Sequence, residues 1–132
     1  LSKLNDKTRL ECELETLENY INQTNVNDNI ITTPKECLHN GILNISFNNV
    51  EGESLVLAMN KEYIYISSGS ACSAGSIEPS YVLTSMGYSD SVAKNAIRIS
   101  LKRSYLYTDE QLKEIANTLV KCVNNIRRIN GD

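Results

Sequence analysis

Two hydrophobic periodicities alternate along the chain, and their order restricts the fold more than any other feature of the sequence. Three short segments alternate apolar and polar residues with a period of two: residues 43–47, 63–67 and 97–101. This period is typical of a strand with one buried face, and Ile64 and Ile66 form the inward pair of the second segment. Helical patterns precede, separate and follow these segments. The order predicts an α/β layer, in which helices cover the apolar face of a sheet.

Two long amphipathic helices are expected, one near each end of the chain. The first covers residues 6–22 and the second follows Thr108-Asp-Glu-Gln111, a capping box that satisfies the first free backbone N–H groups. The apolar stripes are Leu10, Leu14, Leu17 and Ile21 in the first helix, and Leu112, Ile115, Leu119, Cys122 and Ile126 in the second. Each stripe gives its helix one face to bury.

The segments between these elements are shorter. Residues 22–40 form a connecting stretch with a possible short strand at Ile30–Thr32. Glu51-Gly-Glu-Ser54 leads into a short helix that ends near Met59, and its acidic residues suit the positive end of the helix dipole. A chain of 132 residues is long enough for one domain, so residues 1–132 are expected to form a single domain.

The charge balance and the N-terminal residues exclude several classes of protein. Thirteen lysines and arginines against sixteen aspartates and glutamates give a net charge of −3, which argues against direct nucleic-acid binding and an anionic membrane surface. The first twenty residues contain neither a secretory signal nor a membrane span, so a cytoplasmic protein is expected. The chain begins with Leu1 and not with methionine, which indicates a piece of a longer protein.

One loop is built almost entirely of small residues around a cysteine. Residues 67–79 include five serines, two glycines and two alanines, with Cys72 between Ala71 and Ser73. Such a stretch has little apolar surface to bury, so we expect a mobile loop with an accessible thiol. A thiolate is a strong nucleophile even as a minor fraction at neutral pH. The alternative is a flexible linker in which Cys72 is incidental, but long structureless loops inside a domain are usually functional.

The other cysteines and the one histidine are weaker candidates. Cys122 lies on the stripe of the last helix and is expected to pack in the core, while Cys12 lies on the opposite face of the first helix and could be exposed or covered. Cys37 has no neighbouring base, and His39 is best explained as a solvated loop residue. With one histidine and no CxxC motif, no metal site is expected.

Arg98 is the second candidate functional residue. If Ile97 and Ile99 face the core, Arg98 points to the opposite face of its strand. A guanidinium binds a carboxylate with two hydrogen bonds, so an amino-acid substrate is one natural partner. A surface arginine or a structural ion pair explains the local sequence equally well.

Several motifs in order resemble one family. They are Asn44-Ile-Ser-Phe47, Val50-Glu-Gly-Glu-Ser54, Ser67-Ser-Gly-Ser-Ala-Cys72, Glu78-Pro-Ser80 with Val82-Leu83, and Ile97-Arg-Ile-Ser-Leu101. Together they resemble the C-terminal small domain of a NifS/IscS-type cysteine desulfurase, of the class V aminotransferase family. The resemblance implies the α+β small domain of fold-type I enzymes that depend on pyridoxal phosphate, with a mostly antiparallel sheet of about three strands packed with an N-terminal and a C-terminal helix.

The resemblance also implies a reaction, residues and partners. The full-length enzyme would use pyridoxal phosphate as an electron sink to convert L-cysteine to L-alanine. Cys72 would be the nucleophile and persulfide carrier, and Arg98 would hold the substrate carboxylate. The sulfur would pass to an acceptor protein, either an iron–sulfur scaffold or a tRNA-thiolation enzyme. Full-length members of the family are homodimers.

This chain lacks the family's His-Lys pair, so we predict that it alone binds no pyridoxal phosphate and has no desulfurase activity. Lys102 stands where the family commonly has glycine, and residues 103–107 form a longer link than usual. The family pattern therefore does not predict the backbone conformation at the end of the Arg98 strand. Apolar surface on the first helix, at Leu4, Leu10 or Cys12, is expected to face an absent domain. Two alternatives are a stand-alone persulfide-relay domain and a non-catalytic interaction module.

Overall fold

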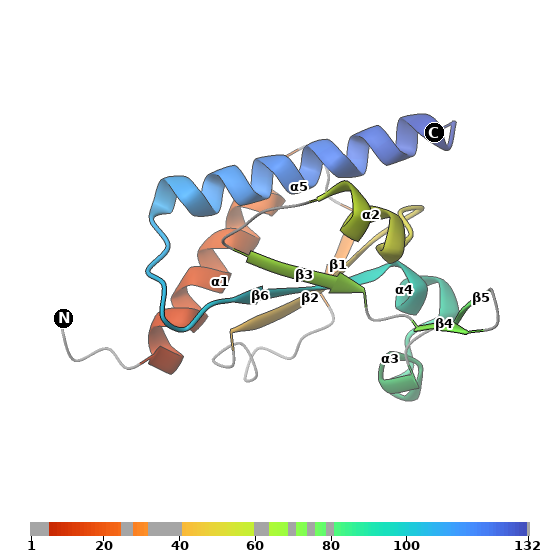
Figure 1. The fold of residues 1–132 in the computed structure, drawn as a ribbon, viewed down its shortest axis with the longest axis horizontal. Helices are drawn as coiled ribbons and strands as arrows, with labels where there is room; N and C mark the ends of the chain where they lie inside the picture. Colours follow the sequence, from red (N-terminus) through yellow and green to blue (C-terminus); the bar gives the residue numbers. More distant parts are fainter. Residues whose placement is uncertain are drawn as a thin grey trace.

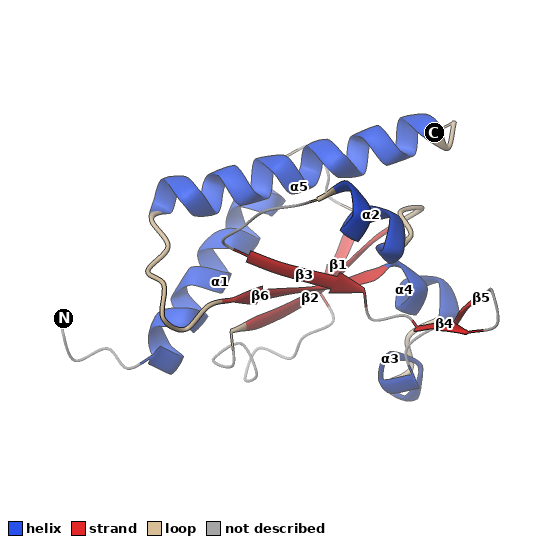
Figure 2. Ribbon diagram, viewed as in Figure 1, coloured by secondary structure: helices blue, strands red, loops and turns tan. Residues whose placement is uncertain are grey.

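The computed structural model describes residues 6–24, 28–31, 41–59, 64–68, 71–73, 76–78 and 81–131. Five helices and six strands occur within this part of the chain (Figures 1 and 2). The helices are α1 (Asp6–Asn22), α2 (Gly52–Ala58), α3 (Tyr81–Ser85), α4 (Asp90–Asn95) and α5 (Asp109–Ile129). The strands are β1 (Asn29–Ile31), β2 (Ile42–Phe47), β3 (Ile64–Ser68), β4 (Ala71–Ser73), β5 (Ser76–Glu78) and β6 (Ala96–Leu101).

The main sheet has the strand order β1-β2-β6-β3, and every pair in it is antiparallel. The predicted α/β fold with a small antiparallel sheet is confirmed. The described strands number four in this sheet, one more than expected, because β1 pairs with the edge of β2 close to the possible strand at Ile30–Thr32. Strand β6 is one of the two interior strands and lies between β2 and β3. A residue on β6 therefore has neighbours on both sides.

One face of the sheet forms the hydrophobic core with α1 and α5, which pack beside each other (Figure 1). The strand register pairs Leu43 with Ile99 and Ile45 with Ile97, and all four side chains are fully buried. The predicted helical stripes face them, apart from Cys122 and Ile126, which are only partly buried at the margin of the core. Apolar burial on this scale is the main stabilising term of the fold.

Helix α5 begins as the sequence predicts. The Thr108 hydroxyl accepts a hydrogen bond from the Gln111 backbone N–H at 3.1 Å, and the Gln111 side chain accepts one from the Thr108 N–H at 2.9 Å. Helix α2 begins at Gly52, close to the prediction, with Glu53 in its first turn. Local sequence signals set both helix starts.

Helix α1 binds the link that follows β6. Arg9 donates to the Tyr105 carbonyl at 2.9 Å and also to the Arg103 carbonyl. Glu13, only 8% exposed, accepts from Arg9 at 3.0 Å and from the Tyr107 backbone N–H at 3.0 Å. The long link that departs from the family pattern is thus attached to the first helix by charge-assisted hydrogen bonds.

Two expectations about this region are settled. Of the residues named as alternatives for an apolar surface on the first helix, Leu10 is fully buried in the core stripe next to Gly41, whereas Cys12 is exposed. Leu4 lies outside the described residues. Among the described non-glycine residues only Asn49 has a positive φ, so Lys102 needs no glycine-like backbone at the exit from β6. None of the helices in the described ranges combines the length and apolar character needed to cross a membrane.

Candidate functional site

Arg98 lies at the centre of the sheet and on the face opposite the core. Its backbone pairs with Asn44 on β2 and with Ser67 on β3. Because directly paired residues of antiparallel strands share a face, Asn44 and Ser67 flank Arg98 on this outer face. Arg98 is exposed, in contrast to its buried neighbours Ile97 and Ile99. The predicted outward orientation is confirmed, and it leaves the guanidinium accessible to an anion.

The outer face of the sheet is covered at one end and exposed to solvent at the other. At one end α4 covers it: the Ser46 hydroxyl donates to the Val92 carbonyl at 3.0 Å, and Ser46 is only 2% exposed. At the other end it is open, with Tyr65 64% exposed and the Lys102 ammonium 5.4 Å from the centre of the Tyr65 ring. This cation–π contact keeps a second positive charge on the same face as Arg98.

The strand pair that carries Cys72 follows β3 directly. Strand β4 begins three residues after the end of β3 and pairs antiparallel with β5, with Cys72 opposite Ile77 (Figure 1). The sequence predicts a mobile loop over residues 67–79, whereas the described backbone includes these two short strands. The mobility of the segment and the accessibility of the thiol stay predictions, because the side chains of β4 and β5 lie outside the described residues.

The chain connection limits how far Cys72 can lie from the Arg98 strand. Five residue steps separate Ser67, the register partner of Arg98, from Cys72. At no more than about 3.6 Å per residue, their Cα atoms lie within roughly 18 Å of each other. The fold therefore brings the two predicted site residues to the same end of β3. Sequence reasoning gave no role to Asn44 or Ser67, since alternation predicts a face and only the register gives the neighbours.

Two of the remaining cysteines, Cys12 and Cys122, lie within the described residues. Cys122 is partly buried against the core, and its thiol contacts the Ala58 carbonyl at 3.5 Å. Cys12 is exposed on α1 in this chain. Cys37 and His39 lie outside the described residues. In the part of the chain that the structure describes, no cluster of three or more histidine, cysteine or acidic side chains could hold a metal ion.

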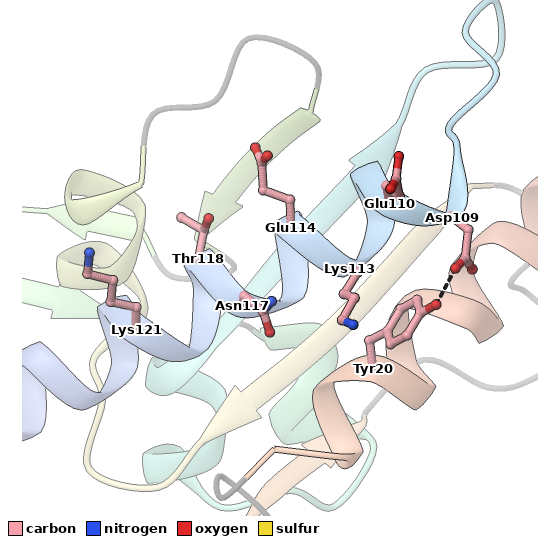
Figure 3. Close-up of a pocket in the computed structure, with 8 residues that line it drawn as sticks. All are labelled: Tyr20, Asp109, Glu110, Lys113, Glu114, Asn117, Thr118 and Lys121. Carbon is pink, nitrogen blue, oxygen red and sulfur yellow. Dashed lines mark hydrogen bonds between the residues drawn. The ribbon is translucent and has the colours of Figure 1, made fainter.

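A polar pocket on α5 is the other candidate site (Figure 3). It is lined by Tyr20, Asp109, Glu110, Lys113, Glu114, Asn117, Thr118 and Lys121. The Tyr20 hydroxyl donates to the Asp109 carboxylate, and this hydrogen bond, with the negative charge of Asp109, raises the pKa of the phenol.

This pocket does not fit pyridoxal phosphate. A phosphate at the start of α5 would meet the carboxylates of Asp109 and Glu110, and Glu114 adds a third negative charge against the two lysines. The Gln111 N–H, which could bind a phosphate at a helix start, already donates to Thr108. The pocket that we describe thus offers no place for the cofactor.

Comparison with known proteins gives the family. The family model for aminotransferase class V matches residues 6–114. This chain belongs to the aminotransferase class V family. The match covers all described elements except the C-terminal part of α5 and confirms the resemblance found in the motifs.

Relatives of this class V chain are of the NifS/IscS type. The cysteine desulfurase IscS of Shewanella piezotolerans (strain WP3 / JCM 13877) is 40% identical over 121 residues, which are 92% of this chain and 28% of that protein. The same enzyme of Shewanella pealeana (strain ATCC 700345 / ANG-SQ1) is 39% identical, with the same coverage. The chain spans 28% of the length of these relatives.

Solved structures share the fold. A NifS-like protein superposes with a TM-score of 0.67 at 25% identity, over 89% of this chain and 28% of that chain. A NifS-like protein from Rickettsia africae ESF-5 superposes with a TM-score of 0.63 at 20% identity, over 89% of this chain and 29% of that chain. The second likeness concerns the fold alone.

Proposed function

We propose that this chain is the C-terminal, cysteine-bearing domain of a cysteine desulfurase. The full-length enzyme would convert L-cysteine to L-alanine and retain the sulfur as a persulfide on Cys72. The observation that carries this proposal is the connection between β3 and β4: a cysteine strand begins three residues beyond the strand that pairs with Arg98. The names of the curated relatives support the same activity.

Each of the two residues would have one task. The Arg98 guanidinium, exposed at the centre of the outer face, would bind the carboxylate of L-cysteine through paired hydrogen bonds. Asn44 and Ser67 flank Arg98 and would limit the directions that its side chain can take. Cys72, on a short connection of small residues, would approach the substrate sulfur and then deliver sulfur to a second protein.

In the proposed sulfur transfer, Cys72 forms the new bond to the sulfur of L-cysteine. The thiolate of Cys72 attacks the sulfur of L-cysteine, so that an S–S bond forms while the C–S bond breaks. The electron pair of the C–S bond stays on the substrate carbon, which takes up a proton and becomes the methyl group of alanine. The sum is L-cysteine plus the Cys72 thiol giving L-alanine plus the Cys72 persulfide. The outer sulfur then passes to a thiol of the acceptor.

Pyridoxal phosphate would supply the electron sink for C–S cleavage in the full-length enzyme. Because the described pocket does not fit it, we propose that the cofactor is bound by a part of the enzyme outside this chain, and that this chain alone releases no alanine. An iron–sulfur scaffold and a tRNA-thiolation enzyme are the two proposed classes of acceptor. The full-length enzyme is proposed to be a homodimer.

The test measures alanine release and the persulfide on Cys72 in the full-length protein that contains this chain. Cys72→Ala should abolish both, whereas Cys12→Ala, which removes an exposed cysteine on α1, should change neither. Arg98→Ala should weaken cysteine binding by about 2–5 kcal/mol, the cost of removing one partner of a desolvated charge pair.

Four results would count against this proposal or against one of its residue roles. Alanine release that survives Cys72→Ala would exclude Cys72 as the nucleophile. Sulfur uptake on Cys72 of this chain alone, from a persulfide donor and without the cofactor, would favour the relay domain. If the full-length protein showed neither activity, the alternative of a non-catalytic interaction module would be favoured. Unchanged turnover at low cysteine in Arg98→Ala would make Arg98 a structural residue.

A further inference from the structure

Gly52, the first residue of α2, lies against a corner where three elements meet. A Cβ atom built on Gly52 would be 2.6 Å from the Ala96 carbonyl oxygen, 3.2 Å from the Lys94 carbonyl oxygen and 3.1 Å from the Ser68 hydroxyl. Ala96 begins β6, Lys94 belongs to the end of α4, and Ser68 ends β3. The start of α2 thus touches the point where β3 leaves the sheet and β6 enters it.

The shortest of these distances concerns the backbone. Folded proteins essentially never bring a Cβ atom within 3.0 Å of a non-bonded heavy atom, so a side chain at residue 52 requires the Ala96 carbonyl or the start of α2 to move. The Ser68 hydroxyl can rotate away, but a carbonyl that begins a central strand moves only with that strand. The backbone of Gly52 has no positive φ, so the close approach, and not conformational freedom, is what requires glycine here.

The corner lies beside both residues of the proposed site. Ala96 is two residues before Arg98 on β6, and Ser68 is four residues before Cys72. Ser68 also pairs with Ile97, so the end of β3 and the start of β6 are joined in the sheet at this point. A shift of the Ala96 carbonyl therefore moves the strand of Arg98 and the start of the connection to Cys72 together.

We propose that Gly52 is a positioning residue for Arg98 and Cys72. The missing side chain lets α2 hold the end of β3 and the start of β6 at fixed places, which sets where the guanidinium and the cysteine strand pair lie relative to each other. The inference rests on the proposed function, because it gives Gly52 a part in substrate binding and sulfur transfer. It also predicts an effect on Cys72 that can be measured without turnover.

The test compares Gly52→Ala with Glu53→Ala in the full-length protein that contains this chain. Glu53→Ala changes the next residue of α2, which is partly exposed, and leaves the corner intact. The two measurements are the rate of Cys72 alkylation by iodoacetamide, located by peptide mass spectrometry, and KM and kcat for alanine release from L-cysteine. Far-ultraviolet circular dichroism establishes that each variant is folded.

Gly52→Ala is expected to change the alkylation rate of Cys72 at least threefold and to raise KM at least fivefold, while Glu53→Ala stays within twofold on both. A folded Gly52→Ala protein with the native alkylation rate and native KM would overturn the inference. If Gly52→Ala does not fold, Ser68→Thr crowds the same corner from β3 and must change the alkylation rate. If the native protein releases no alanine, the proposed function fails. The alkylation rates then still test whether Gly52 positions Cys72.

Discussion

The hydrogen bonds of Glu13 give the sharpest prediction about the stability of this domain. Its two carboxylate oxygens accept from Arg9 and from the Tyr107 backbone N–H, each at 3.0 Å, in a place where Glu13 is 8% exposed. Glu13→Gln keeps the size of the side chain but replaces one oxygen by an NH₂ group. Whichever way the amide turns, a donor then faces either the guanidinium or the backbone N–H.

The magnitude follows from the two bonds. A hydrogen bond to a charged group contributes about 1.5–3 kcal/mol, so two such bonds set an upper limit near 6 kcal/mol. Arg9 keeps its bonds to the carbonyl oxygens of Tyr105 and Arg103, and its side chain is 15% exposed, so part of the loss is recovered. We expect Glu13→Gln to lower the free energy of unfolding by about 2–4 kcal/mol.

Urea unfolding followed by far-ultraviolet circular dichroism measures this difference. The matched control is Glu15→Gln, an exposed residue on the same helix, which should change the free energy of unfolding by less than about 0.5 kcal/mol. The dependence on urea should be the same for all three proteins, because the same surface is exposed on unfolding. If Glu13→Gln is as stable as the control, the hydrogen bonds of Glu13 do not hold the link after β6.

Two further predictions concern the same end of the domain. Burial raises the pKa of the Tyr107 phenol, so the folded protein binds a proton that the unfolded chain releases above about pH 10, and stability falls as pH rises through this range. Tyr107→Phe removes the acceptor of the Lys102 N–H bond at 3.1 Å and should cost about 1–2 kcal/mol at pH 7. The difference in the free energy of unfolding between the native protein and Tyr107→Phe should shrink between pH 9 and pH 11. A difference that stays constant over this range would contradict the raised pKa of Tyr107. Thr108→Ala removes the N-cap of α5 and should lower the free energy of unfolding in urea by about 1 kcal/mol, whereas Thr118→Ala, inside the same helix, should not lower it. Equal effects of the two substitutions would show that the cap does not stabilise α5.

The sequence alone determined the two long helices, three strands of the main sheet and their buried faces, but not the strand pair β4 and β5. The period of the apolar residues predicted α1, α5 and the inward side of the strands, because a repeat of 2 or 3.6 residues is a local property. The capping box at Thr108 predicted where α5 begins for the same reason. The motifs around Cys72 and Arg98 were also sufficient for the family.

Only the tertiary structure decided which residues are neighbours. The alternation of β6 predicted that Arg98 faces away from the core, but the antiparallel register gives Asn44 and Ser67 as its flanking residues. Leu10 belongs to the predicted apolar stripe and was also one of three alternatives for a surface that faces a missing domain, and the fold shows that it is fully buried beside Gly41.

The role of Gly52 is also decided only by the tertiary structure. In the sequence it reads as one glycine among acidic residues at a helix start, and its backbone angles would suit an alanine. The need for glycine comes from the carbonyl of Ala96, forty-four positions away along the chain. Contacts between segments so distant in sequence depend on how the layers pack, and packing is a property of the whole fold and not of any local pattern.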